Sequence, residues 1–209
     1  MDRKMHWDAV YARKNPLEVS WYQAEPVRSL ELIAATGVPL DAPLIDIGGG
    51  ASVLVDRLLG RGYTDVTVLD LSARAFAYAR TRLGAQAACV HWLDADVTEF
   101  VPARRYAVWH DRAVLHFLTA AADRRRYVEA LNRSLMADGQ VIIAAFALGG
   151  PTRCSDLDIV QYDAAKLCAE LGAAFALVEE TAERHVTPGG KDQQFGYFRF
   201  VRHASGRGP

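Results

Sequence analysis

The sequence predicts an α/β fold, a three-layer αβα sandwich whose mostly parallel sheet carries helices on both faces. From Leu44 onward, short apolar runs alternate with stretches of helical periodicity, and this alternation is typical of βαβ units. The first apolar run ends in three consecutive glycines, Gly48, Gly49 and Gly50. The last two extended runs flank a Thr-Pro-Gly-Gly turn, so we expect them to form an antiparallel hairpin that closes the sheet.

In the first half of the chain, the elements follow from periodicity and from capping residues. Helical spacing over residues 5–13 and 24–35 predicts two helices that precede the alternating region. Apolar and β-branched runs then predict strands at 44–47, 66–69 and 89–93, and a helix follows the three glycines. Ser72 is a predicted N-cap for a helix over residues 73–83.

The second half continues the alternation and ends in the hairpin. Asp123 is expected to cap a long amphipathic helix that reaches Met136, because Tyr127, Leu131 and Leu135 share one helical face. An Asp-Gly turn at residues 138–139 leads into the fifth strand. The remaining predicted elements are strands at 106–110 and 140–146, a helix near 163–171, and extended runs at 173–186 and 193–202.

The chain of 209 residues is expected to form a single domain, since chains usually divide only beyond roughly 250 residues. Within it, we expect N-terminal helices over 1–40, an α/β core over 41–203 and a disordered tail over 204–209, which has nothing to bury.

Composition excludes several classes of function. Lys and Arg total 24 against 25 Asp and Glu, a net charge of −1, which argues against a nucleic-acid-binding protein held by a basic excess. No apolar run is long enough to span a membrane, and the first residues lack the apolar core of a signal peptide. Three scattered cysteines suit neither a disulfide framework nor a metal site, so a reducing, cytoplasmic location without a bound metal is expected.

The glycine turn at residues 48–50 is the strongest functional signal. Glycines at the carboxyl end of a strand let a ligand approach the backbone, and the helix that follows offers free N–H groups. A dinucleotide fingerprint has the form G-x-G-x-x-G, but Val53 stands at the third glycine position. Asp46 would also repel a pyrophosphate while it could hold an ammonium group. The turn therefore favours a cationic, phosphate-free nucleoside over a nicotinamide dinucleotide; a tight turn without ligand is the alternative.

Carboxylates also follow the second and third predicted strands. Asp70, with Leu71 next to it, stands twenty residues after Gly50, where an acid can accept both ribose hydroxyls. After the third strand, a short acid can bind an adenine amino group while Val97 packs on the ring. Asp94 and Asp96 compete for that role, and one of them is expected to be only a loop acid.

Together these residues resemble the class I S-adenosylmethionine-dependent methyltransferases. The family pattern of D-x-G-x-G-x-G followed by two further acids matches Asp46, Gly48, Gly50, Asp70 and Asp96, with Ser52 in place of the last glycine. The resemblance covers residues 44–202. It implies a seven-stranded sheet, the donor over the first, second and fourth strands, N-terminal helices as a lid, and a backbone contribution to the cofactor pocket from His110.

The sequence signal for the methyl acceptor is less specific than the signal for the donor. In the resembling family, acceptor groups follow the fourth strand, where Asp111 could orient or desolvate the acceptor and His116 could act as a base. This stretch and the opening Trp-Asp-x-x-Tyr at residues 7–11 also resemble the elongation-factor lysine methyltransferases. That family ends its Asp-Lys-Gly-Thr-x-Asp element in an acid, and here the position is His116. The alternative role for His116 is a half-packed helix residue.

Two aromatic residues complete the candidates. Trp21 and Tyr22 could cover the sulfonium and the acceptor, because a ring face near a cation is favourable by about 0.5–2 kcal/mol. They could equally pin the N-terminal helix to the core. Cys154, after the fifth strand, is interpreted as an ordinary loop residue rather than an acceptor-pocket residue.

The sequence thus predicts an enzyme that transfers a methyl group from S-adenosylmethionine to a small-molecule or protein nucleophile and releases S-adenosylhomocysteine. The alternatives are a non-catalytic module that binds the same donor, and a protein-lysine methyltransferase. The accepting atom remains open among sulfur, nitrogen, oxygen and carbon, and the chain is expected to be a monomer or a homodimer.

Overall fold

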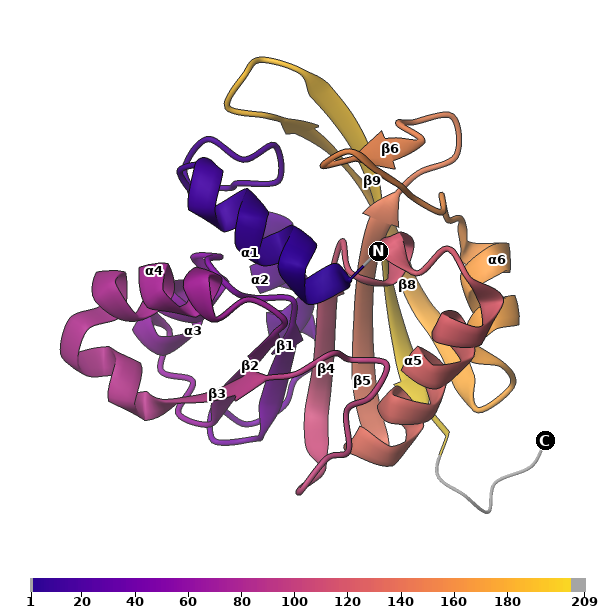
Figure 1. Cartoon of the computed structure of the whole chain (residues 1–209). Helices are drawn as coiled ribbons and strands as arrows, with labels where there is room; N and C mark the ends of the chain where they lie inside the picture. Colours follow the sequence, from indigo (N-terminus) through magenta and orange to yellow (C-terminus); the bar gives the residue numbers. More distant parts are fainter. Residues whose placement is uncertain (1, 204–209) are drawn as a thin grey trace.

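The computed structural model describes residues 2–203, so the tail expected to be disordered lies outside the described residues. Its main sheet has the strand order β3-β2-β1-β4-β5-β9-β8 (Figure 1). The strands are β1 (Leu44–Ile47), β2 (Val66–Asp70), β3 (Val90–Asp94), β4 (Tyr106–Arg112), β5 (Leu135–Phe146), β8 (Phe175–Val186) and β9 (Asp192–Arg202). β1 to β5 are parallel, and β9 runs antiparallel to both β5 and β8. The predicted seven-stranded sheet with a closing hairpin is confirmed.

Helices cover both faces of the sheet, which completes the three layers. They are α1 (Arg3–Arg13), α2 (Val27–Ala35), α3 (Leu54–Gly60), α4 (Ala73–Leu83), α5 (Ala121–Ser134) and α6 (Ala164–Leu171), with short 3₁₀ turns η1 (Gly84–Cys89) and η2 (Leu115–Phe117). Apolar residues of α2, α3 and α4 pack on one face, and those of α5 and α6 pack on the other. Ser72 caps α4 as predicted, because its hydroxyl accepts a hydrogen bond from the N–H of Ala75.

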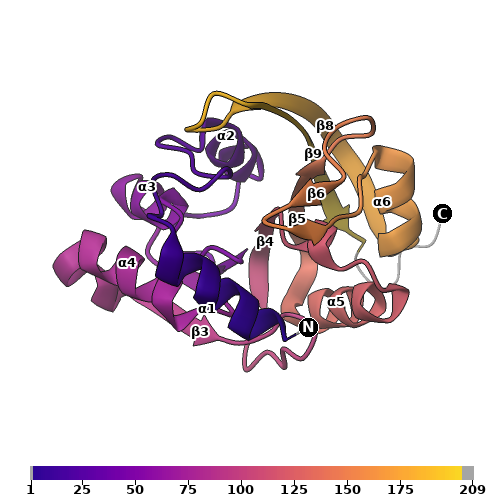
Figure 2. The same cartoon turned by 45° about the horizontal axis from the view of Figure 1, so that its top comes forward.

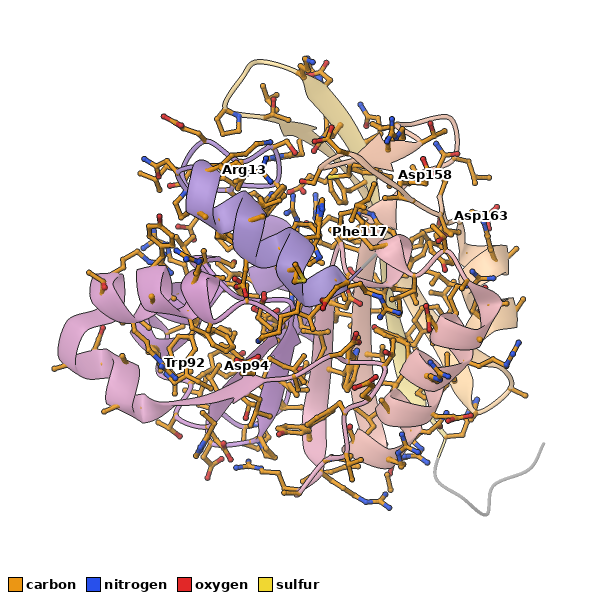
Figure 3. All side chains as sticks on the ribbon, viewed as in Figure 1. Arg13, Trp92, Asp94, Phe117, Asp158 and Asp163 are labelled. Carbon is orange, nitrogen blue, oxygen red and sulfur yellow. The ribbon has the colours of Figure 1, made fainter. Side chains whose placement is uncertain are left out.

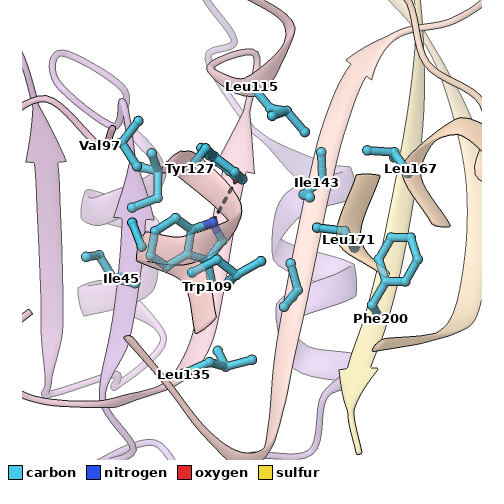
Figure 4. Close-up of a cluster of buried hydrophobic side chains, with 14 of the residues drawn as sticks. Ile45, Val97, Trp109, Leu115, Tyr127, Leu135, Ile143, Leu167, Leu171 and Phe200 are labelled. Carbon is cyan, nitrogen blue, oxygen red and sulfur yellow. Dashed lines mark hydrogen bonds between the residues drawn. The ribbon is translucent and has the colours of Figure 1, made fainter. Parts of the chain in front are cut away.

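The face under α5 and α6 holds the larger aromatic core (Figure 4). Trp109 of β4 is fully buried there, and its indole N–H donates to the hydroxyl of Tyr127 on α5 over 2.9 Å. Because a buried indole N–H needs a partner, this bond fixes the register of α5 on the sheet. The predicted helical face of Tyr127, Leu131 and Leu135 is buried in this core.

Helix α1 lies across the carboxyl ends of the parallel strands rather than on a face of the sheet (Figures 1 and 2). Polar contacts help to hold it there. Arg3 pairs with Asp96 and Asp123 over 2.9 and 2.7 Å, and the hydroxyl of Ser72 donates to Asp8 over 2.7 Å. Helix α1, at the start of the chain, therefore covers the carboxyl ends of the parallel strands.

Several predicted boundaries were wrong. Asp123 does not cap α5: Ala120 is the N-cap, and Asp123 lies in the first turn, where it pairs with Arg3. The helix ends at Ser134 rather than Met136 because the chain enters β5 at Leu135. The Asp-Gly turn became an irregularity inside that strand, with Asp138 at a φ of +58°.

The hairpin of β6 (Arg153–Cys154) and β7 (Leu157–Asp158) was not predicted. Its two-residue strands are too short to give an alternating pattern. The predicted helix 24–35 begins only at Val27, after Pro26 as N-cap. No helix within residues 2–203 is long and apolar enough to cross a bilayer.

Candidate functional site

A cavity opens at the carboxyl ends of the parallel strands; we call it the main cavity. At one end it is lined by Asp70, Leu71, Asp96 and Val97, which follow β2 and β3. At the other end it is lined by groups on or near β4, β5 and β9, including His116, Phe146 and Phe195. Strand order separates the two ends, because β1 and β4 stand between β2 and β5. A ligand can therefore lie across the switch point of the sheet.

A second, smaller cavity lies against the glycine turn; we call it the turn cavity. Its lining includes Asp46, Ser52, His110 and Tyr22. Gly48, Trp21 and Arg112 line both cavities. The two spaces thus meet at the start of the glycine turn, which brings most of the predicted donor residues around one continuous edge.

The glycine turn has no room for side chains. A Cβ on residue 48 would overlap the side chain of Val114, and one on residue 49 would overlap the carboxylate of Asp46. Gly48 also has a φ of +68°, which disfavours other residues. A Cβ on Gly50 would stand 2.5 Å from Asp70 Oδ2. The backbone of the turn is therefore packed directly against two carboxylates.

Asp46 belongs to a buried chain of three side chains. Its Oδ1 lies 2.7 Å from His110 Nδ1, and His110 Nε2 lies 2.9 Å from the hydroxyl of Ser29 on α2. All three residues are at most 3% exposed and all line the turn cavity. The sequence predicted only a backbone contribution from His110; the structure shows its side chain fixing one oxygen of Asp46 and linking it to α2.

Asp70 is the buried acid of the main cavity. The N–H of Ser72 donates to Asp70 Oδ1 over 2.8 Å, while Oδ2 lies beside Gly50. Burial, and to a smaller extent the nearby charge of Asp46, raises the pKa of Asp70 from 3.8 to about 7 despite the Ser72 bond. A further hydrogen-bond donor would stabilise the charged form of this carboxylate and lower its pKa.

Of the two acids after β3, Asp96 faces the main cavity and Asp94 does not. Asp94 is exposed and pairs with Lys4 over 2.5 Å (Figure 3). Asp96 accepts hydrogen bonds from the N–H and hydroxyl of Thr98 and from the guanidinium of Arg3. Asp94 is thus the surface acid of the pair, and Asp96 is already bound by Arg3 of α1.

Asp111 points away from both cavities. Its carboxylate accepts from the hydroxyl of Tyr127 over 2.7 Å and from the N–H groups of Val114 and Leu115 over 2.8 and 3.0 Å. Burial raises its pKa to about 6, although these bonds act in the opposite direction. The structure does not bring Asp111 to the acceptor end, and its geometry is that of a group that shapes the loop after β4.

His116 lies on the lining of the main cavity and is fully buried. Its ring packs against Phe117 and Phe146 with centroids 4.4 and 5.0 Å apart. Within the described part of the chain, neither ring nitrogen has a hydrogen-bond partner. Burial, with a smaller effect of the Arg112 charge, lowers the pKa of His116 to about 3, so the imidazole is neutral at physiological pH.

Arg112 is a site residue that the sequence interpretation missed. Its guanidinium donates to the hydroxyl of Tyr197 and to the carbonyl of Trp21, both over 2.9 Å, and lies 4.6 Å from the centre of the Phe195 ring. Its Nη2 is buried without a hydrogen-bond partner in residues 2–203 and stands 3.9 Å from Glu183. Only its place between Asp111 and His116 could have pointed to it.

The acceptor end is otherwise walled by aromatic rings from distant segments. Trp7 packs edge-on against Trp21 and Phe117, with centroids 5.6 and 5.0 Å apart, and Phe117 lies beside α1 (Figure 3). Phe146 and Phe195 meet at 4.7 Å. Of the predicted aromatic pair, Trp21 lines both cavities and Tyr22 only the turn cavity. Cys154, interpreted as a loop residue, lines the main cavity and is buried.

Comparison with known proteins agrees with this geometry. A family model described as a methyltransferase domain matches residues 44–139. The chain is similar to EEF1A lysine methyltransferase 2 of Mus musculus, with 26% identity over 157 residues that cover 67% of this chain and 64% of that protein. The match therefore spans slightly less than two thirds of this relative.

Solved structures share the fold. One solved structure has a TM-score of 0.77 and 21% identity, and the match covers 96% of this chain and 92% of that one. Its description concerns the conversion of a disulfide bond into a thioacetal group during echinomycin biosynthesis. The N-methyltransferase NodS of Bradyrhizobium japonicum WM9, in complex with S-adenosyl-L-homocysteine, has a TM-score of 0.73 and 16% identity, covering 95% and 97%. Both likenesses concern the whole architecture described above.

Proposed function

We propose that the chain is a class I S-adenosylmethionine-dependent methyltransferase, which transfers the donor's methyl group to a nucleophile and releases S-adenosylhomocysteine. The observation that carries the proposal is Asp70. A carboxylate that is 8% exposed, with a raised pKa and one oxygen against Gly50, stands at the end of β2 in a cavity that crosses the switch point. Two ribose hydroxyls would supply the donors that this carboxylate lacks.

The remaining donor contacts follow from the two cavities. Asp46, held by His110, is proposed to bind the ammonium of the amino-acid end in the turn cavity, beside Gly48, Gly49 and Ser52. Gly50 does not line that cavity, and its proposed role is to leave room for the carboxylate of Asp70. Leu71, Asp96 and Val97 are proposed to surround the adenine. Because Arg3 already occupies Asp96, the adenine amino group has to share that carboxylate with α1.

Positioning is the main contribution that this site can make to the reaction. Methyl transfer from a sulfonium is an in-line displacement, so holding acceptor and donor in line supplies much of the rate. We propose that His116 touches the acceptor, that Trp21 and Tyr22 cover the two substrates, and that Asp111 acts only as a positioning residue. Asp111 does this by fixing the N–H groups of Val114 and Leu115.

Calorimetric titration with S-adenosylhomocysteine tests the donor site. We expect binding by the wild type and a loss of about tenfold or more in Asp70→Asn, because one charged hydrogen bond contributes roughly 1.5–3 kcal/mol. Asp94→Asn is the matched control, since Asp94 is an exposed acid that does not line the main cavity. Equal affinity in wild type and Asp70→Asn would refute the ribose assignment.

A protein acceptor is the second candidate, favoured by the similarity to the mouse EEF1A lysine methyltransferase 2. Incubation of cell extract with methyl-labelled donor separates the two classes, because label ends either in protein or in small molecules. Label in neither fraction, with the donor still bound, would indicate a non-catalytic binding module.

We propose a cytoplasmic location from the three free cysteines, Cys89, Cys154 and Cys168. Whether the chain is a monomer or a homodimer stays a prediction.

A further inference from the structure

The acceptor end of the main cavity is shaped for a flat, apolar body. Its walls are the rings of Trp7, Trp21, Phe117, Phe146 and Phe195, which come from five separate segments. Ring pairs in this wall meet edge-on or tilted at centroid distances of 4.7 to 5.6 Å. Such walls offer ring faces and edges to an aromatic guest, and few hydrogen bonds to a polar one.

The charged side chain that lines this end of the cavity is a cation. Among the described residues that line the main cavity, the carboxylates are Asp70 and Asp96, and both follow strands at the opposite end. The charged group near the rings is Arg112, whose Nη2 lacks a hydrogen-bond partner in the described chain. Glu183 stands behind it at 3.9 Å, does not line the cavity, and is bound by Tyr197 and Gln23. An ammonium group would find no counter-charge here, whereas an anion would.

His116 adds a hydrogen-bonding group at the same place. It is fully buried, lines the cavity and has no partner for either nitrogen within residues 2–203. The titratable groups that share the cavity with it are Arg112 from β4, Cys154 from β6, and Arg3, Tyr11, Asp70 and Asp96 towards the other end. With its pKa lowered to about 3, His116 is a poor proton acceptor, but a neutral imidazole always carries one N–H donor.

Building on the proposed function, we infer that the acceptor is a small aromatic thiol or phenol that binds as its anion, with the N–H of neutral His116 donating to the nucleophilic atom. The acceptor loses its proton to solvent before transfer. Its lone pair forms the new bond to the methyl carbon while the bond from that carbon to the sulfonium breaks, and the bonding electrons stay on the donor sulfur. An anion and a cation become two neutral groups at this centre, so no base is needed in the step.

Three acceptors with the same ring test this inference with S-adenosylmethionine as donor: 2-naphthalenethiol, 2-naphthol and 2-naphthylmethylamine. We expect product from the thiol or the naphthol, and a rate for the amine lower by about 100-fold or more, since an unpaired buried charge costs several kcal/mol. The faster of the first two identifies the accepting atom. Preference for the amine, or no product from thiol and naphthol while S-adenosylhomocysteine still binds by calorimetry, would overturn the inference and leave the donor site standing. Loss of that binding would instead count against the proposed function.

Two substitutions test the role of His116. His116→Gln keeps an N–H donor and should lower kcat/KM less than His116→Leu, which should lose about 10- to 100-fold because a hydrogen bond to a charged group is removed. His91→Gln, at an exposed histidine outside both cavities, is the control.

The pH profile of the reaction is a second test of the same question. Across a series of ring-substituted thiols, the inflection of kcat/KM should follow the pKa of each thiol. An inflection that stays at one pH for every acceptor and disappears in His116→Gln would make His116 the base and overturn the inference.

Discussion

Asp70 Oδ2 lies 2.5 Å from the point where a Cβ on residue 50 would stand, so Gly50 and Asp70 share one small volume. The same Cβ would also approach Ala75, the first-turn residue of α4, to 2.9 Å. The carboxylate and the turn backbone therefore cannot be varied independently. A change in the glycine turn reaches the proposed ribose site directly.

Gly50→Ala should displace the Asp70 carboxylate and weaken S-adenosylhomocysteine binding, together with a loss of about 1–3 kcal/mol in the free energy of unfolding from overpacking. Gly84→Ala is the matched control, because Gly84 also has a positive φ, +56°, but a Cβ added there would have nothing within 4 Å. The control should lose stability through backbone strain alone and should keep its donor affinity. Calorimetry and urea unfolding measure both quantities, and equal donor affinity in Gly50→Ala and wild type would contradict the shared volume.

The raised pKa of Asp70 makes its contribution to stability depend on pH. With a pKa of 3.8 unfolded and about 7 folded, the folded state binds more protons between about pH 4 and 7. The contribution of Asp70 to the free energy of unfolding therefore falls as pH rises through that window. Asp70→Asn should gain stability over the wild type at pH 8, by at most about 4 kcal/mol at roughly 1.4 kcal/mol per pKa unit, and little at pH 4.

Donor affinity should move in the opposite direction. If ribose hydroxyls donate to the ionised carboxylate, wild-type affinity for S-adenosylhomocysteine rises as pH rises towards and through about 7, and Asp70→Asn loses this dependence. In the comparison of stabilities, His116 has the opposite pH dependence because its pKa is lowered. This effect is common to wild type and Asp70→Asn, so it cancels in the difference between their free energies of unfolding. A stability difference that is the same at pH 5 and pH 8 would show that Asp70 is not the titrating group.

Ser29→Ala should affect only the amino-acid end of the donor site. It removes the hydroxyl that holds His110 Nε2, and through His110 it loosens Asp46. Affinity for S-adenosylhomocysteine should fall by about 5- to 10-fold, the effect of one net hydrogen bond. Methylthioadenosine lacks the amino-acid portion, so its affinity should be unchanged. Equal losses for both ligands would indicate general destabilisation instead.

Asp111→Ala should mainly cost stability. It leaves the hydroxyl of Tyr127 and two backbone N–H groups without their buried acceptor, and each such group costs about 1–3 kcal/mol. Asp111→Asn retains one acceptor oxygen and should lose less, with donor affinity close to that of the wild type. Thermal unfolding and calorimetry measure the two effects. A folded Asp111→Asn with normal donor affinity and no methyl transfer would restore a catalytic role.

The sequence predicted best what depends on local pattern. The glycine turn, the Ser72 cap and the acids at the carboxyl ends of β1, β2 and β3 each follow from neighbours a few residues away. Asp111 and His116 show the limit of that approach. They stand five residues apart in one motif, yet the turn between them sends Asp111 into the core beside Tyr127 and His116 into the main cavity. Which way each points depends on α5 and β5, elements that no local pattern connects to them.

The aromatic walls were missed for a related reason. Phe146, Phe195 and Trp7 meet at one cavity only after the sheet places β5 beside β9 and α1 crosses the strand ends. Arg3 was missed because an exposed arginine near the start of a helix is ordinary in sequence. Its two acidic partners lie 93 and 120 residues away.

Arg3 has a consequence for how quickly the pocket exchanges its contents. One guanidinium ties helix α1 to Asp96 on the loop after β3 and to Asp123 on α5, with both pairs partly exposed to water. If these charges have to separate before a nucleoside beneath that helix can leave, dissolved salt should speed its release, because salt weakens partly exposed charge pairs. Release of S-adenosylhomocysteine that is faster at high ionic strength in the wild type, but not in Arg3→Ala, would show that the third residue of the chain controls this exchange.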